Sequence, residues 1–216
     1  MTSAAALLSN YTLTSRSRVI LAILLLAIPA LSYALWLQQP QLAEENGALE
    51  HFQVGLIALA CFIHSVHSIK FNTSSLGYVI RAGFALLTYS FLLRELDIEH
   101  LGSSPLWATL ERALRILRVV LWLGFFVFIA KKAKLLYGQR AGLSTSTTFW
   151  LSAAGGMFLI AGGIFDRHIF SSIPFSLSRL AEEVLELNGY FLIFVASLCR
   201  ATAPLLPAKS SASAGA

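Results

Sequence analysis

Charged residues are scarce in this sequence. Only 12% of its 216 residues are Asp, Glu, Lys or Arg, whereas a soluble domain carries roughly a quarter. Apolar residues make up 56%, and the mean hydropathy is +0.71. This composition excludes an ordinary soluble domain and indicates a polytopic membrane protein. We interpret the net charge of +5 as a topology signal, and we expect no nucleic-acid partner.

Cysteine is equally rare, because Cys61 and Cys199 are the only two. Both fall on the side of the membrane predicted to be cytoplasmic, where a reducing compartment favours free thiols over a disulfide. Catalytic motifs are missing too: the sequence has no Gly-x-Ser-x-Gly, no phosphate-binding loop, no dinucleotide glycine pattern and no His-Glu-x-x-His. The sequence therefore gives no positive indication of an enzyme, and it predicts no cofactor.

Long apolar runs, by contrast, are frequent. A transmembrane helix needs about 20 mostly apolar residues. Six such runs are present, at about 19–37, 49–69, 76–96, 113–130, 149–165 and 185–199. None alternates with a period of two, as the strands of a membrane barrel do. We predict an all-α bundle of six transmembrane helices, with one membrane-embedded domain over residues 1–202 and a disordered tail over 203–216.

The first apolar run and the segment before the last run each allow a further prediction. The first run follows Arg16 and Arg18 and ends near Ser32-Tyr33-Ala34, so a cleaved signal peptide is the alternative to a first span. Before the last run, Pro174 predicts a break in the helix within residues 169–179.

Lys and Arg gather on one side of the predicted membrane. With a cytoplasmic N-terminus, ten of the sixteen lie inside, among them Arg81, Lys131, Lys132 and Lys134. This positive-inside bias predicts that both termini are cytoplasmic and that the protein is a multi-pass protein of the cell inner membrane. All eleven Asp and Glu residues then fall at the other end of the spans, which makes the extracytoplasmic face acidic.

Several charges lie inside the predicted hydrocarbon layer. At ~1.5 Å per helical residue, Glu186 is about 21 Å from Arg200 and Arg118 about 20 Å from Lys131. A charge at that depth costs at least ~2.5 to 3.5 kcal/mol, so such residues face the bundle interior and pair. We predict a buried charge network near the outer leaflet, with Gln53 as a neighbour, formed by Glu50, Arg94, Glu95, Arg115, Arg118, Glu183 and Glu186.

Three functions fit such a network. The favoured one is a pocket that binds or moves a small polar or ionic ligand or a proton, because ionisable residues inside the membrane mark sites and pathways. The first alternative is a structural or assembly subunit, in which buried ion pairs only fix the helix packing. The second is a metal-dependent membrane enzyme that uses His51, His100 or His168 with the glutamates, since imidazole and carboxylate bind divalent metals.

Two further patterns concern packing and polar groups. In the run 149–165, Gly155 and Gly162 are seven residues apart, and small residues at this spacing allow close helix approach. We interpret this as packing inside one bundle, with a homo-oligomer or a partner membrane protein on this helix as the alternative. Cys61, His64 and His67 form a polar group near the cytoplasmic side, but no histidine is expected at the same depth on another helix, which argues against haem.

Overall fold

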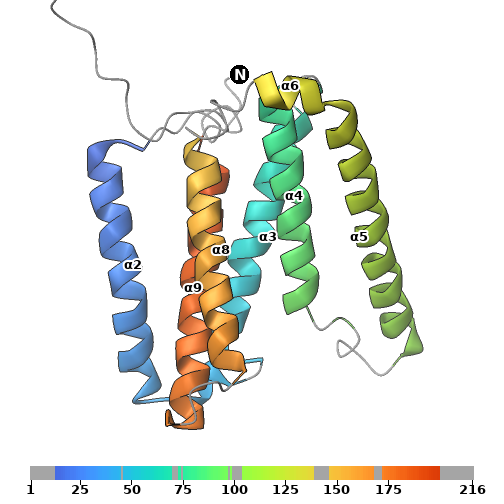
Figure 1. Cartoon of the computed structure of the whole chain (residues 1–216). Helices are drawn as coiled ribbons and strands as arrows, with labels where there is room; N and C mark the ends of the chain where they lie inside the picture. The colour runs from blue at the N-terminus through green and yellow to red at the C-terminus, as the bar shows by residue number, and fades with distance from the viewer. Residues whose placement is uncertain are drawn as a thin grey trace, which may run out of the picture.

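The computed structural model of the protein is a bundle of helices (Figure 1). It describes residues 13–44, 46–69, 73, 75–96, 98, 104–138, 146–167 and 172–199. The helices are α2 (Ser15–Trp36), α3 (Ala48–Ile69), α4 (Leu76–Glu95), α5 (Pro105–Lys131), α6 (Ala133–Gly138), α8 (Thr147–Asp166) and α9 (Phe175–Leu198), and the 3₁₀ turn η1 (Pro40–Ala43) connects α2 to α3. These residues include no β-strand, so the all-helical prediction is confirmed.

Five helices are long and apolar enough to cross a membrane: α2, α3, α4, α5 and α8. Each overlaps one of the apolar runs found in the sequence. The sequence predicts a sixth span, but α9 is not among the five, since Glu182, Glu183 and Glu186 interrupt its apolar character. The predicted tail, 203–216, lies outside the described residues.

Local sequence explains where the helices begin. The hydroxyl of Ser104 accepts a hydrogen bond from the Leu106 amide, and Pro105 follows at the first helical position, where proline fits well. α5 therefore starts eight residues before the predicted apolar run. α9 starts at Phe175, directly after Pro174. The break that Pro174 predicts is therefore confirmed, since α8 ends at Asp166 and α9 begins only after the proline, and residues 175–179 already belong to α9.

The core of the bundle is α9. It packs most extensively against α8 and then α3, with smaller contacts to α2 and η1. Glycines bring α8 and α9 together: a Cβ atom on Gly155 would lie 2.7 Å from the carbonyl oxygen of Gly189, and one on Gly189 would lie 2.8 Å from that of Gly155. The interpretation that small residues pack α8 inside one bundle therefore holds for Gly155. The oligomer alternative stays a prediction.

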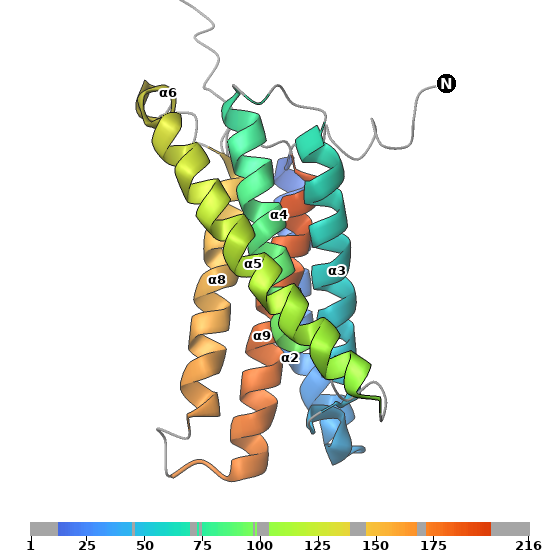
Figure 2. The same ribbon diagram turned by 90° about the vertical axis from the view of Figure 1, so that its right-hand side faces the viewer.

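α5 lies at the edge of the bundle. It crosses α4 at an angle (Figure 2), and α4 is its main packing partner. Trp122 Nε1 donates to Ser90 Oγ at 2.9 Å, and the ring of Phe125 fits against Gly83. Glu111 is the one buried residue of this helix. α5 therefore contributes little to the core.

Candidate functional site

A group of buried charged side chains lies where the C-terminal end of α4 meets the middle of α9. Arg94 Nε is 2.7 Å from Glu95 Oε1, and its Nη2 is 2.5 Å from Glu186 Oε1. The hydroxyl of Tyr190 donates to Glu95 Oε1 at 2.6 Å. Both carboxylate side chains are only 8% exposed, whereas that of Arg94 is 49% exposed. The arginine therefore connects a buried carboxylate pair with the surface.

The first turns of α9 extend this group toward α3. Arg179 pairs with Glu182 at 3.3 Å and with Glu183 at 3.5 Å. From α3, Gln53 Nε2 donates to the Glu183 carboxylate at 2.8 Å and to the Glu183 carbonyl at 3.0 Å. The other amide atom, Gln53 Oε1, is buried and has no hydrogen-bond partner among the described residues. A buried acceptor of this kind favours a donor or cation beside Glu183.

Helical spacing and one glycine create this arrangement. Glu182, Glu186 and Tyr190 recur every four residues, so they share a face of α9. On α8, a Cβ atom at Gly162 would lie 2.9 Å from Glu186 Cγ, so the glycine leaves room for the glutamate side chain. We define the acidic cluster by its eight members: Gln53, Arg94, Glu95, Arg179, Glu182, Glu183, Glu186 and Tyr190.

The acidic cluster has more negative than positive groups. Its four carboxylates, those of Glu95, Glu182, Glu183 and Glu186, have side chains that are 6–11% exposed. It contains two guanidinium groups. With the four carboxylates and two guanidinium groups ionised and Tyr190 neutral, the cluster therefore carries two negative charges in excess. Nearby carboxylates add to this field, because the charge of Asp166 acts on Glu182 and Glu186, and that of Glu50 acts on Glu183.

A cavity of about 560 Å³ adjoins the acidic cluster. It lies between α4 and α8. Its lining includes Phe91, Arg94, Gly156, Ile160, Gly163 and Arg167. Arg94 belongs to both the cavity lining and the cluster, so the cavity reaches the cluster at the partner of Glu186.

The structure brings some of the predicted site residues together and leaves others apart. Arg94, Glu95, Glu183 and Glu186 belong to one cluster. Glu50 accepts a hydrogen bond from the Asn46 amide at 2.6 Å, at the start of α3, within electrostatic range of Glu183.

The α5 arginines lie elsewhere. Arg115 pairs with Glu111 of its own helix, and its side chain is 58% exposed. Arg118 is half-buried, and its charge acts on Tyr89 of α4. The sequence predicts that both arginines balance the glutamates of α9. Arg115 instead pairs with Glu111 of its own helix, because α5 sits at the edge of the bundle. Arg179 takes that position instead.

Sequence reasoning missed Arg179 and Tyr190. Arg179 precedes Glu182 and Glu183 by three and four residues, the spacing of helical ion pairs, so that signal was available. Tyr190 follows Glu186 by four residues, but a tyrosine in an apolar run carries no specific signal.

The histidines proposed as metal ligands give no metal site in the described chain. His51 is exposed, and its Nδ1 lies 2.7 Å from the Gly47 carbonyl oxygen. His100 and His168 lie outside the described residues. Within the ranges that the structure describes, no three His, Cys, Asp or Glu side chains are grouped to hold a metal ion. The metal-dependent enzyme therefore stays a prediction without structural support.

A second polar site lies at the opposite end of α9. Arg81, which the sequence suggests only as a topology signal, is 1% exposed. It donates to the carbonyl oxygens of Ser197, at 2.8 Å, and of Cys199. Its Nη1 also lies 3.1 Å from His64 Nδ1. Because arginine only donates, His64 accepts at Nδ1 and its proton is on Nε2. Arg81 thus binds the free carbonyls at the C-terminal end of α9, where the helix dipole favours a cation.

No family model, curated protein or solved structure matches this chain.

Proposed function

We propose that the protein is a multi-pass protein of the cell inner membrane that binds a proton or a small cation at the acidic cluster. In this proposal α9 is the sixth spanning helix, both termini are cytoplasmic, and the acidic cluster faces the extracytoplasmic side. α9 needs no uniformly apolar surface, since its glutamates are buried against α3, α4 and α8 and do not face lipid.

The charge imbalance of the cluster carries this proposal. Four buried carboxylates face two arginines, and an uncompensated charge in a bundle surrounded by hydrocarbon is costly. The excess is removed when a carboxylate takes up a proton or when a cation binds between carboxylates. Both outcomes reduce the excess negative charge of the cluster, and neither requires a helix to move.

Glu183 is the favoured position for the bound proton or cation. Its ion pair with Arg179, at 3.5 Å, is the longest in the cluster. The orphan acceptor Gln53 Oε1 belongs to the amide that already binds Glu183 through Nε2. A protonated Glu183 or a cation beside it would satisfy that acceptor.

A structural role is the second candidate, and the contact between Arg94 and Glu186 favours it. The two residues are on different helices, and an interhelical ion pair can fix helix packing without any ligand.

Infrared difference spectroscopy in lipid nanodiscs tests the proposal, with pH and Na⁺ concentration as the variables. We expect wild type to show a carboxyl signal that responds to pH or Na⁺, and Glu183→Gln to lose it. Glu44→Gln is the matched control, because Glu44 is exposed at the same end of the bundle, and it should keep the signal. A wild type with no responsive carboxyl would overturn the proposal. A structural role predicts instead that Glu183→Gln lowers thermal stability and leaves the carboxyl signal unchanged.

A further inference from the structure

A cavity of about 850 Å³ separates α5 from α3 and α4. It shares no residue with the acidic cluster. Small side chains of Cys61 on α3 and Ala82 and Ala85 on α4 line it, and Gly124 of α5 lies opposite. Tyr78 and Phe128 lie at one of its ends, with ring centroids 5.6 Å apart.

The cavity exists because α5 contacts α4 at a few points only, and the hydrogen bond from the Tyr89 hydroxyl to the Leu114 carbonyl, at 3.3 Å, is one of those that border it. The hydrogen bond from Trp122 to Ser90 and the contact of Phe125 with Gly83 hold the two helices together. Between these contacts, Cys61, Ala82, Ala85 and Gly124 are too small to fill the space. A Cβ atom at Gly124 would meet nothing within 4 Å. The lining of the cavity is mostly apolar.

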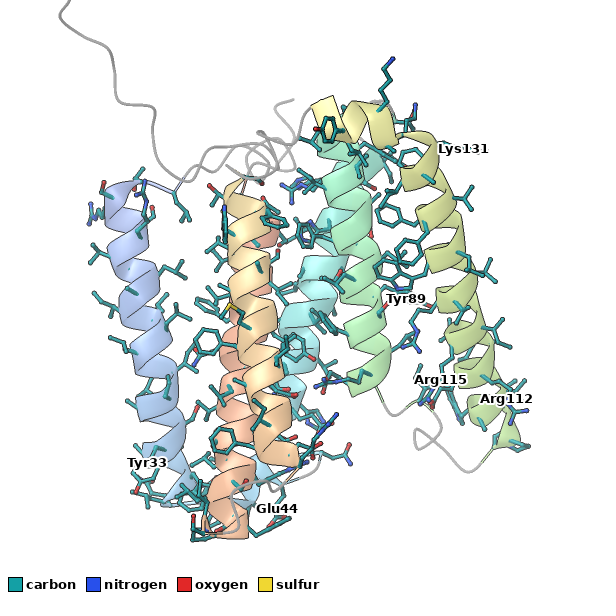
Figure 3. The ribbon with its side chains drawn as sticks, viewed as in Figure 1. Tyr33, Glu44, Tyr89, Arg112, Arg115 and Lys131 are labelled. Carbon is teal, nitrogen blue, oxygen red and sulfur yellow. The ribbon has the colours of Figure 1, made fainter. Side chains whose placement is uncertain are left out.

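Positive charge gathers at one end of this cavity. Phe128 lines the cavity, and Lys131 and Lys132 follow it by three and four residues, one helical turn further along α5. Lys134 comes next on α6. No Asp or Glu occurs in the sequence between Glu111 and Asp166. Figure 3 shows Lys131 at the end of α5 opposite to Arg112 and Arg115.

We propose that the cavity binds one phospholipid with an anionic headgroup. An acyl chain fills the space between α3, α4 and α5, and the phosphate lies beside Lys131 and Lys132. Basic residues next to a gap between transmembrane helices bind anionic headgroups, and tyrosine is favoured at the depth where headgroup and acyl chain meet. Tyr78 occupies that depth at the basic end of the cavity. The proposal is independent of the acidic cluster.

Native mass spectrometry of the full chain tests this site, with phosphatidylglycerol and phosphatidylcholine of the same acyl chains as probes. Wild type should retain one phosphatidylglycerol per chain, preferred over phosphatidylcholine by roughly 10- to 30-fold if two lysines contact the headgroup. Lys131→Gln with Lys132→Gln should remove the preference.

Filling the cavity provides the second arm of the test. Gly124→Leu should abolish retention of the lipid. Gly55→Leu is the matched control, because a Cβ atom there also meets nothing within 4 Å and Gly55 does not line the cavity. Ala82→Leu fills the same space from α4 and replaces Gly124→Leu if circular dichroism shows that variant to be unfolded. Equal retention by Gly124→Leu and Gly55→Leu, equal binding of the two lipids by wild type, or a dimer that Gly124→Leu dissociates would each overturn the proposal.

Discussion

The guanidinium of Arg94 and the carboxylate of Glu186 lie 2.5 Å apart, although 92 residues separate them in the chain. α4 packs mainly against α3, and α9 mainly against α8 and α3. The contact between α4 and α9 at this end of the bundle combines these charged side chains with ring packing, since the centroids of Phe91 and Tyr190 are 6.0 Å apart. Tyr190 reinforces it through its hydrogen bond to Glu95.

Replacing Arg94 should destabilise the protein. Arg94→Gln leaves Glu95 and Glu186 without their cation, and an unsatisfied buried partner costs roughly 1–3 kcal/mol. The measurement is thermal unfolding in detergent followed by circular dichroism. Arg112→Gln, at an exposed arginine of α5, should change stability by less than ~0.5 kcal/mol. Adding Glu186→Gln to Arg94→Gln should recover part of the loss, because the double variant removes one stranded carboxylate. Equal stability of Arg94→Gln and Arg112→Gln would contradict this account.

Arg81 should be more sensitive to substitution than its place in the sequence suggests. Arg81→Gln removes the guanidinium donors of the Ser197 and Cys199 carbonyls and leaves Cys199 only the Thr148 hydroxyl, at 3.4 Å, so we expect a loss of at least ~2 kcal/mol. Arg81→Lys should be intermediate, because an ammonium keeps the charge but cannot fork between two carbonyls. The same unfolding assay measures both variants. Arg81→Gln with wild-type stability would mean that the carbonyls do not depend on this side chain.

Two adjacent glycines of α8 should respond in opposite ways. Gly155→Ala places a methyl group against the backbone of α9, and overpacking of this kind costs roughly 1–3 kcal/mol. Gly156→Ala meets nothing within 4 Å, and alanine favours a helix by up to ~1 kcal/mol, so this variant should be as stable as wild type or slightly more stable. Unfolding temperatures of the pair decide the matter. If both variants lost a similar amount of stability, the close contact between α8 and α9 would not be the reason why Gly155 must be small.

Cysteine labelling should establish the orientation. Gln41 on η1 and Lys134 on α6 are exposed, and α3, α4 and α5 separate them in the chain. A maleimide that cannot cross membranes, added outside intact cells, should label Gln41→Cys and leave Lys134→Cys unlabelled. The opposite pattern would invert the proposed topology. Labelling of both positions would contradict three crossings between them.

Much of the fold could be predicted because helix length and apolarity are local properties of a sequence. The five spans follow directly from runs of about 20 apolar residues. The depth of a residue in the membrane also follows from its position along its own helix. For this reason the sequence predicts Arg94, Glu95 and Glu186 at a similar depth. Which way a helix turns and which helix lies beside it are not local. Arg115 has the right depth, but its helix lies at the edge of the bundle and Glu111 is its partner.

The site at Arg81 could not be predicted for a different reason. Its partners are main-chain carbonyls at the C-terminal end of α9. Every helix ends with such carbonyls, whatever its residues are. A sequence therefore gives no indication of which arginine will bind them. Charged pairs of opposite sign, such as Arg94 and Glu186, can be matched by residue type, whereas a contact with the backbone cannot.

Two arginines of α4 hold α9 at two levels, Arg94 at Glu186 in the middle of the helix and Arg81 at its last carbonyls. A translation of the helix along its own axis by one residue, ~1.5 Å, would stretch the contacts at both levels together. The bundle can therefore not relax one end of this helix by sliding it. Any rearrangement that accompanies a change of charge at Glu183 or Glu186 must be a rotation of side chains or a tilt of the surrounding helices, with α9 as the fixed element.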